Sequence, residues 1–122
     1  MARSRLTKRS RRTSRRQRTQ PTKRKIEQLI EEAIVDAYDE SEQRVGFLTL
    51  LEEHLALPFT TTLLGVGVTV ERIDLGKTSD IVARCRHGKA RQAIPILELP
   101  LPTPPPAGAE WIEAYRSWVR GR

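Results

Sequence analysis

The chain has 122 residues, enough for one small domain, and its net charge of +7 is unevenly distributed. Residues 1–25 carry twelve of the 22 Lys and Arg and no acid, so residues 26–122 sum to about −5. A single cysteine excludes an internal disulfide framework, and no apolar run approaches the ~20 residues that a membrane span requires. We therefore expect a monomeric cytoplasmic domain with no membrane association.

The first segment, residues 1–25, is expected to be a disordered basic arm. Leu6 is its only large apolar residue between Ala2 and Lys25, so it contains no apolar segment of the kind that a secretory signal has. Such a density of positive charge binds polyanions and loses affinity steeply with salt. Because the arm has no aromatic side chains for base stacking, its composition favours equally two interpretations, non-specific binding of nucleic acid and a solubilising tail.

Two amphipathic helices follow. Apolar residues spaced three and four apart from Ile26 predict the first helix, which should end near Tyr38. Asp39 and Glu42 have the spacing of a capping box and begin the second helix, which Pro58 ends. The buried stripe of this second helix is predicted at Val45, Leu48, Leu51 and Leu55, widened by Phe47 and Leu50.

Gly46 interrupts the second helix. A glycine costs roughly 1 kcal/mol relative to alanine in a helix interior. We therefore expect another segment of the chain to approach closely at this position.

Beyond Pro58 the chain becomes rich in Thr, Val and Ile, and glycine-containing turns divide it into short segments. This pattern predicts strands at Thr60–Leu64, Val66–Leu75, Asp80–Arg86 and Arg91–Leu97. Four such strands favour a small SH3-like antiparallel sheet or barrel. With two N-terminal helices packed on it, the fold class is α+β.

The chain ends with a proline-rich spacer and a third helix. Residues 100–109 resemble a stiff polyproline spacer. Residues 110–122 place Trp111, Tyr115 and Trp118 on one helical face, which should dock back on the domain since both tryptophans would otherwise be exposed. The expected organisation is a basic arm (1–25), an α+β domain (26–99), a spacer (100–109) and a C-terminal helix (110–122).

Six carboxylates surround the second helix and are the candidate metal ligands. Calcium binds six to eight oxygen atoms, so grouped carboxylates suit it, although Asp39 and Glu42 also have a structural reading as helix caps. An EF-hand is excluded, because a loop starting at Asp36 would have Ser41 at its glycine position and Phe47 at its last ligand position. The candidates are Asp36, Asp39, Glu40, Glu42, Glu52 and Glu53.

Glu52 and Glu53 lie near the negative end of the helix macrodipole, where each carboxylate costs ~0.3–1 kcal/mol. A bound cation would reverse this cost. Cys85 and His87 provide only two of the ligands of a tetrahedral zinc site, so we interpret Cys85 as a buried strand residue. His54 is interpreted as a cap of the helix C-terminus in preference to a metal ligand.

Several segments resemble the family of small calcium-binding proteins first described in cyanobacteria. The similarity lies in Ile34-Val-Asp-Ala-Tyr, in Glu42-Gln, in Gly46-Phe and in the run Leu51-Glu-Glu-x-Leu-x-Leu-Pro-Phe. The later Ala93-Ile-Pro-Ile and the tryptophan helix also look like family features. The resemblance implies a fold of helices on a compact β-region, with calcium held by surface carboxylates.

The resemblance centres the calcium site on Glu52 and Glu53. The crowding of carboxylates at the junction of residues 36–42 favours a second, weak site there. The third strand of the family is commonly acid-rich, whereas this chain has Arg84, Arg86 and His87 there, which implies weakened binding.

Three functions are open at this point. The first is a non-catalytic calcium buffer or sensor, since no enzyme signature is found. The second is a nucleic-acid-associated module that binds polyanions through its basic arm. The third, with less support, is an interaction adaptor that uses the proline spacer and the tryptophan helix.

Overall fold

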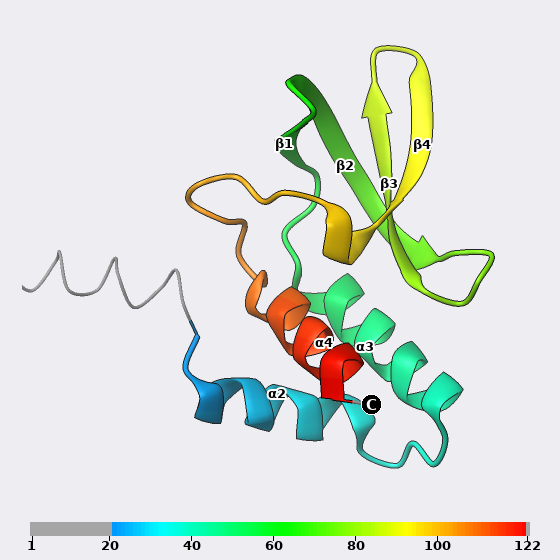
Figure 1. The fold of residues 1–122 in the computed structure, drawn as a ribbon, viewed down its shortest axis with the longest axis vertical. Coiled ribbons are helices and arrows are strands. Elements are labelled where there is room, and N and C mark those ends of the chain that lie inside the picture. Colours follow the sequence, from blue (N-terminus) through cyan, green and yellow to red (C-terminus); the bar gives the residue numbers. More distant parts are fainter. Residues whose placement is uncertain (1–20, 122) are drawn as a thin grey trace, which may run out of the picture.

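The computed structural model describes residues 21–121, which form a layer of helices packed against one end of a four-stranded sheet (Figure 1). The α+β fold class is confirmed. None of the helices in this part of the chain is long and apolar enough to cross a membrane. In chain order the elements are α2 (Lys23–Ile34), α3 (Glu40–His54), β1 (Phe59–Leu63), β2 (Val66–Leu75), β3 (Ile81–His87), β4 (Ala90–Pro95), η1 (Ile96–Glu98) and α4 (Glu110–Gly121).

The sheet is an antiparallel meander in the order β1-β2-β3-β4, and its strands begin and end within two residues of the prediction. A register shift between Val70 and Arg72 bends β2 where it pairs with β3. The edge strands β1 and β4 do not pair with each other in residues 21–121. The SH3-like closure of the sheet is therefore not confirmed.

Helix α2 begins earlier and ends earlier than the sequence suggested. Its N-cap is Thr22, whose Oγ1 accepts a hydrogen bond from the Lys25 amide at 3.1 Å, so α2 includes the last three residues of the expected arm. The helix ends at Ile34 and not near Tyr38, because Asp36 adopts a left-handed backbone with φ 62°. Residues 1–20, the rest of the expected arm, lie outside the described residues.

Helix α3 begins as predicted, with a complete capping box. Asp39 Oδ1 accepts from the Glu42 amide at 2.8 Å, and Glu42 Oε1 accepts from the Asp39 amide at 3.2 Å. The helix ends at His54, before Pro58 is reached, and Leu55 donates its amide to the carbonyl of Leu51.

The expected stripe of α3 is partly wrong. Val45 is 46% exposed, whereas Phe47, which was expected only to widen the stripe, is completely buried together with Leu51. The reason is α4, which packs against the Phe47 side of the helix: the Phe47 ring lies 5.6 Å from that of Tyr115 and 5.3 Å from that of Trp118. The predicted docking of the C-terminal helix is confirmed.

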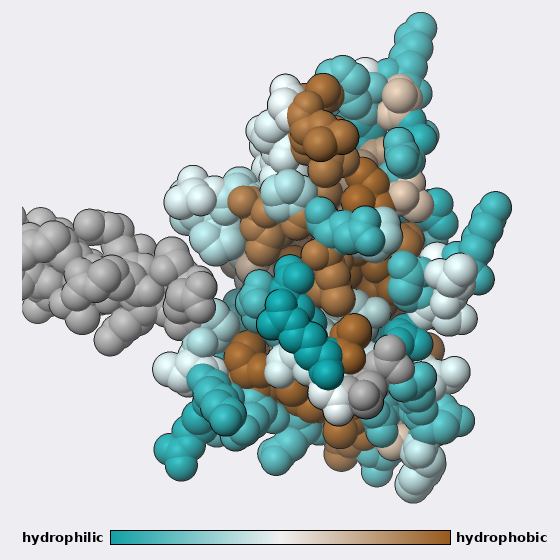
Figure 2. Space-filling view, in the orientation of Figure 1, coloured by the Kyte–Doolittle hydropathy of each residue, from teal (hydrophilic) through white to brown (hydrophobic). Residues whose placement is uncertain are grey.

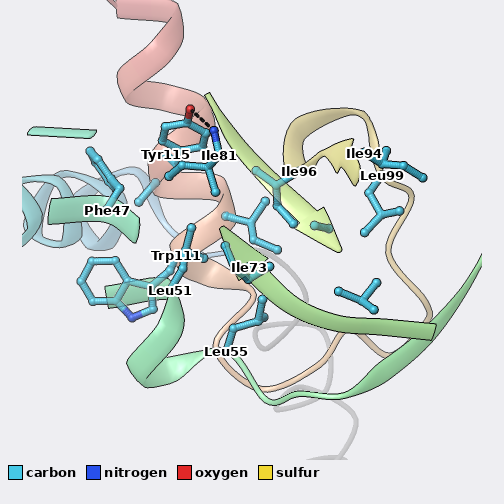
Figure 3. Packing of buried hydrophobic residues seen from close by; sticks show 14 of the residues in the cluster. Phe47, Leu51, Leu55, Ile73, Ile81, Ile94, Ile96, Leu99, Trp111 and Tyr115 are labelled. Atoms are coloured by element: carbon cyan, nitrogen blue, oxygen red, sulfur yellow. Dashed lines mark hydrogen bonds between the residues drawn. The ribbon is translucent and has the colours of Figure 1, made fainter. Parts of the chain in front are cut away.

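The core joins the helices to the sheet (Figure 3). Trp111, Ile112 and Tyr115 of α4 are buried, and the Tyr115 hydroxyl accepts a hydrogen bond from the Ile81 amide of β3 at 3.4 Å. Figure 2 shows apolar side chains running down the middle of this face of the molecule, between the sheet and the helices.

The close approach expected at Gly46 is confirmed. A Cβ atom at this position would clash with the carbonyl oxygen of Ala33, so α2 and α3 cross with their backbones in contact. Gly108, at the start of α4, is a second position of this kind, because its φ is +89° and a Cβ there would clash with the carbonyl of His54.

Candidate calcium site

The junction between α2 and α3 carries four of the six predicted ligands on an exposed turn. Asp36, Asp39, Glu40 and Glu42 are all exposed. One oxygen of Glu42 is engaged by the backbone, because Oε1 accepts from the amides of Tyr38 (2.8 Å) and Asp39 (3.2 Å). The carboxylates of Asp39 and Glu42 therefore hold the turn by hydrogen bonds to its backbone and also add negative charge to it.

Glu52 and Glu53, the other two predicted ligands, are exposed in the last turn of α3. Glu53 Oε1 lies 3.9 Å from Nε2 of His54, whose ring stacks on Trp111 with the centroids 5.4 Å apart. His54 therefore packs against α4 at the end of the helix.

The two groups of carboxylates belong to separate places. A helix rises about 1.5 Å per residue, so Glu42 and Glu52 are about 15 Å apart along α3. Calcium binds its oxygen ligands at about 2.3–2.6 Å and therefore spans only about 5 Å between opposite ligands. One ion cannot use both groups.

Neither group forms a finished metal cage. Within residues 21–121, no three or more Asp, Glu, His or Cys side chains converge closely enough to hold a metal ion. The donor chemistry suits calcium, but most of the coordination would have to come from water and backbone carbonyls. The side chains present therefore supply only part of the oxygen shell that calcium needs.

Charge is segregated between the helices and the sheet. Residues 23–54, which span α2, the junction and α3, contain nine acids and four basic side chains, a sum of −5. Residues 59–95 contain six Lys and Arg and three acids, a sum of +3. The acidic surface of α2, α3 and their junction attracts cations over a range of several ångströms.

The acids of the sheet are committed to arginines. Glu71 Oε2 accepts from Nε of Arg86 at 2.7 Å, and Asp74 Oδ2 accepts from Arg84 at 3.1 Å. These hydrogen bonds hold the pKa of both carboxyls below their usual values. The sequence analysis did not single out this network, although its signal was visible: charged residues alternate with apolar ones in two neighbouring predicted strands.

Cys85 is a buried strand residue, as interpreted from the sequence. Burial raises the pKa of its thiol, and its Sγ lies 3.6 Å from the carbonyl oxygen of Ala83. His87 is exposed, with Nδ1 2.9 Å from the carbonyl oxygen of Gly67.

These features define a class: a small α+β domain that presents an acidic helical surface to solvent. A family model described as calcium binding, of the CcbP type, matches residues 27–119. The chain belongs to this calcium-binding family, which is the one that the sequence resembles, and the ion of the family is Ca²⁺. No curated protein and no solved structure was found to match the chain.

Proposed function

We propose that this protein is a non-catalytic calcium buffer, and that it binds the ion at the junction of α2 and α3. The observation that supports this proposal is the presence of four exposed carboxylates within residues 36–42, in a chain of a calcium-binding family. The ligands would be Asp36, Asp39, Glu40 and Glu42, with water completing the shell.

Backbone geometry favours the junction over the end of α3. Residues 35–38 lie outside both helices, so their backbone carbonyls are not used in helical hydrogen bonds and are available beside the four carboxylates. At the end of α3, by contrast, Gly108 packs against the carbonyl of His54, and Ala56 donates its amide to Ala107. Glu52 and Glu53 therefore have less backbone oxygen beside them and are proposed as a weaker, second place of binding.

Buffering suits this position better than sensing. Helices α2 and α3 are held by backbone contact at Gly46 and Ala33, and the junction carries the exposed side chains of Val35 and Tyr38 at the edge of the domain. An ion bound there would touch few residues of the core. Binding of the ion would therefore change the arrangement of the helices little.

Calcium titrations of the full chain, followed by calorimetry and by backbone NMR, test the proposal. The variant D36N/D39N removes two charges and keeps the N-cap, because Asn accepts the same hydrogen bond as Asp. We expect its calcium affinity to fall at least about tenfold, since one carboxylate about 4 Å from a unit charge contributes about 1 kcal/mol even in water. Backbone shifts should centre on residues 36–42.

Two variants with the same loss of charge are the controls. E52Q/E53Q should weaken calcium binding about twofold or less. E27Q/E31Q, on the solvent face of α2, measures how much the loss of two negative charges away from the site weakens binding through long-range electrostatics alone. A larger loss in E52Q/E53Q would move the site to the end of α3. Equal losses in all three variants would contradict a local site, and no binding at about 10 mM calcium would contradict the function itself.

A further inference from the structure

The outer face of the sheet carries a group of arginines that the proposed calcium function does not use. Ile73, Ala83 and Cys85 face the core, so the residues between and beside them face away from the helices. The ion pairs between Arg84 and Asp74 and between Arg86 and Glu71 lie on this outward side. We call it the arginine face, and its members are Arg72, Arg84, Arg86 and Arg91 with the acids Glu71 and Asp74.

The register places these arginines directly opposite one another. Arg72 is the partner of Arg84 across β2 and β3, and Arg86 is the partner of Arg91 across β3 and β4. Like charges at directly opposed positions destabilise a sheet. Asp74 Oδ2 contacts both Arg84 and Arg72, at 3.1 Å and 3.7 Å, and Glu71 pairs with Arg86. The two carboxylates offset half of the four positive charges, and an excess of like charge on one sheet face is expected where a binding function maintains it.

The arginines are exposed and partly held in place. The side chain of Arg72 is 67% exposed, and those of Arg84 and Arg86 are 40% and 38% exposed. Arg86 bonds to Glu71 through Nε, so that bond fixes the guanidinium and leaves its terminal nitrogens outside it. A guanidinium held at an exposed position is suited to phosphate, which it can bind with two parallel hydrogen bonds.

The composition of the face indicates which phosphates it binds. Phe59 is the only Phe, Tyr or Trp among residues 59–95, and it packs against the core. His87 alternates with Arg86 along β3 and so belongs to the opposite side of the strand, which leaves the arginine face without a ring on which an unpaired base can stack. A duplex keeps its bases stacked inside and presents its phosphates outward. The acidic helices on the other side of the domain would repel the same duplex and so favour this one orientation.

We infer that the arginine face binds the phosphate backbone of double-stranded nucleic acid, without reading base sequence. The basic residues of the first 25 positions would add non-specific attraction to the same partner. This inference is independent of the proposed calcium site, because the two use different residues on different layers.

The test uses the full chain and a fluorescein-labelled DNA duplex of about 16 bp, with anisotropy measured across a range of salt concentrations. R72Q/R91Q leaves the hydrogen bonds of Arg84 to Asp74 and of Arg86 to Glu71 in place and removes only the longer contact of Asp74, 3.7 Å from Arg72. We expect affinity at physiological salt to fall roughly tenfold, and the slope of log affinity against log salt to decrease by about 1.8 for two lost phosphate contacts.

The matched control is K77Q/R120Q, which removes two positive charges from the β2–β3 turn and from α4. It should change affinity by less than about twofold and leave the slope unchanged. R72K/R91K, which keeps the charge and loses the bidentate geometry, should retain the slope. Because R72Q/R91Q removes opposed like charges, its thermal unfolding should occur at the same temperature as that of the native protein or higher.

Three results would overturn the inference. Equal losses in R72Q/R91Q and K77Q/R120Q would show that only net charge matters. Unchanged binding by R72Q/R91Q would assign all the affinity to other parts of the chain. Tighter binding of a single strand than of the duplex would contradict recognition of a duplex backbone.

Discussion

The helices and the sheet of this domain use charge in opposite ways. In residues 23–54, which span α2 and α3, nine acids accompany four basic side chains, so this helical surface has a net negative charge of −5. In the sheet, Glu71 and Asp74 are hydrogen-bonded to Arg86 and Arg84 of the neighbouring strand. The two acids of the sheet therefore have arginine partners on the neighbouring strand, whereas acids outnumber basic side chains in the helical region.

The two regions also differ in what holds them together. The helices pack through close backbone contact at Gly46 and an aromatic cluster around Phe47, whereas the outer face of the sheet is tied by ion pairs between exposed side chains. Burial contributes far more stability than an exposed ion pair. Changes on the helical side should therefore have the larger effects.

The largest expected effect is that of F47A. Removing a completely buried ring that contacts Tyr115 and Trp118 should lower the free energy of unfolding by about 3–5 kcal/mol. The control is V45A, two residues earlier on the same helix, where the side chain is 46% exposed. It should lower the free energy of unfolding by about 0.5 kcal/mol or less. Urea denaturation of both variants measures the difference, and similar losses would contradict the packing of α4 on the Phe47 side.

The next effect is that of G46A. A methyl group would force the backbones of α2 and α3 apart at Ala33, which should cost about 1–3 kcal/mol despite the better helix propensity of alanine. G67A is the control, because open space surrounds that glycine in β2. It should be neutral or slightly stabilising. If G46A is as stable as the native protein in thermal unfolding, the helices do not cross in contact there.

Local signals in the sequence predicted most of the elements. The spacing of Asp39 and Glu42 predicted the start of α3. A glycine in the interior of this helix, Gly46, predicted a close backbone contact, which the structure shows to be with Ala33. The strands followed from β-branched residues between glycine turns. Each of these features depends on residues close to one another in the chain.

Tertiary features could not be predicted in the same way. Two faces of α3 carry apolar residues. Phe47 is buried and Val45 is not because α4, some sixty residues later in the chain, packs on the Phe47 face. The end of α2 depends on the left-handed backbone of Asp36, which aspartate adopts only in some contexts. For the metal site, composition predicted the carboxylates, but whether they converge depends on loop geometry, and the described residues form no cage.

The smallest expected effect is the pH dependence of stability that arises from the two carboxylates of the sheet. The hydrogen bonds from Arg86 and Arg84 lower the pKa of Glu71 and Asp74 in the folded state. A carboxyl whose pKa is depressed by folding contributes stability above its unfolded pKa, about 4, and loses it as the pH falls through the lower folded value. The native protein should therefore lose stability below about pH 4 through these two groups.

E71Q/D74N removes both titrating groups, so the fall in stability between pH 5 and the acidic limit should become shallower than in the native protein. Chemical denaturation at a series of pH values measures the slope. R84Q/R86Q removes the guanidinium partners instead and should flatten the same region in part, because Asp74 keeps the hydrogen bond from the Leu75 amide. A slope unchanged in both variants would mean that the pairs of Arg84 with Asp74 and of Arg86 with Glu71 add nothing to folding.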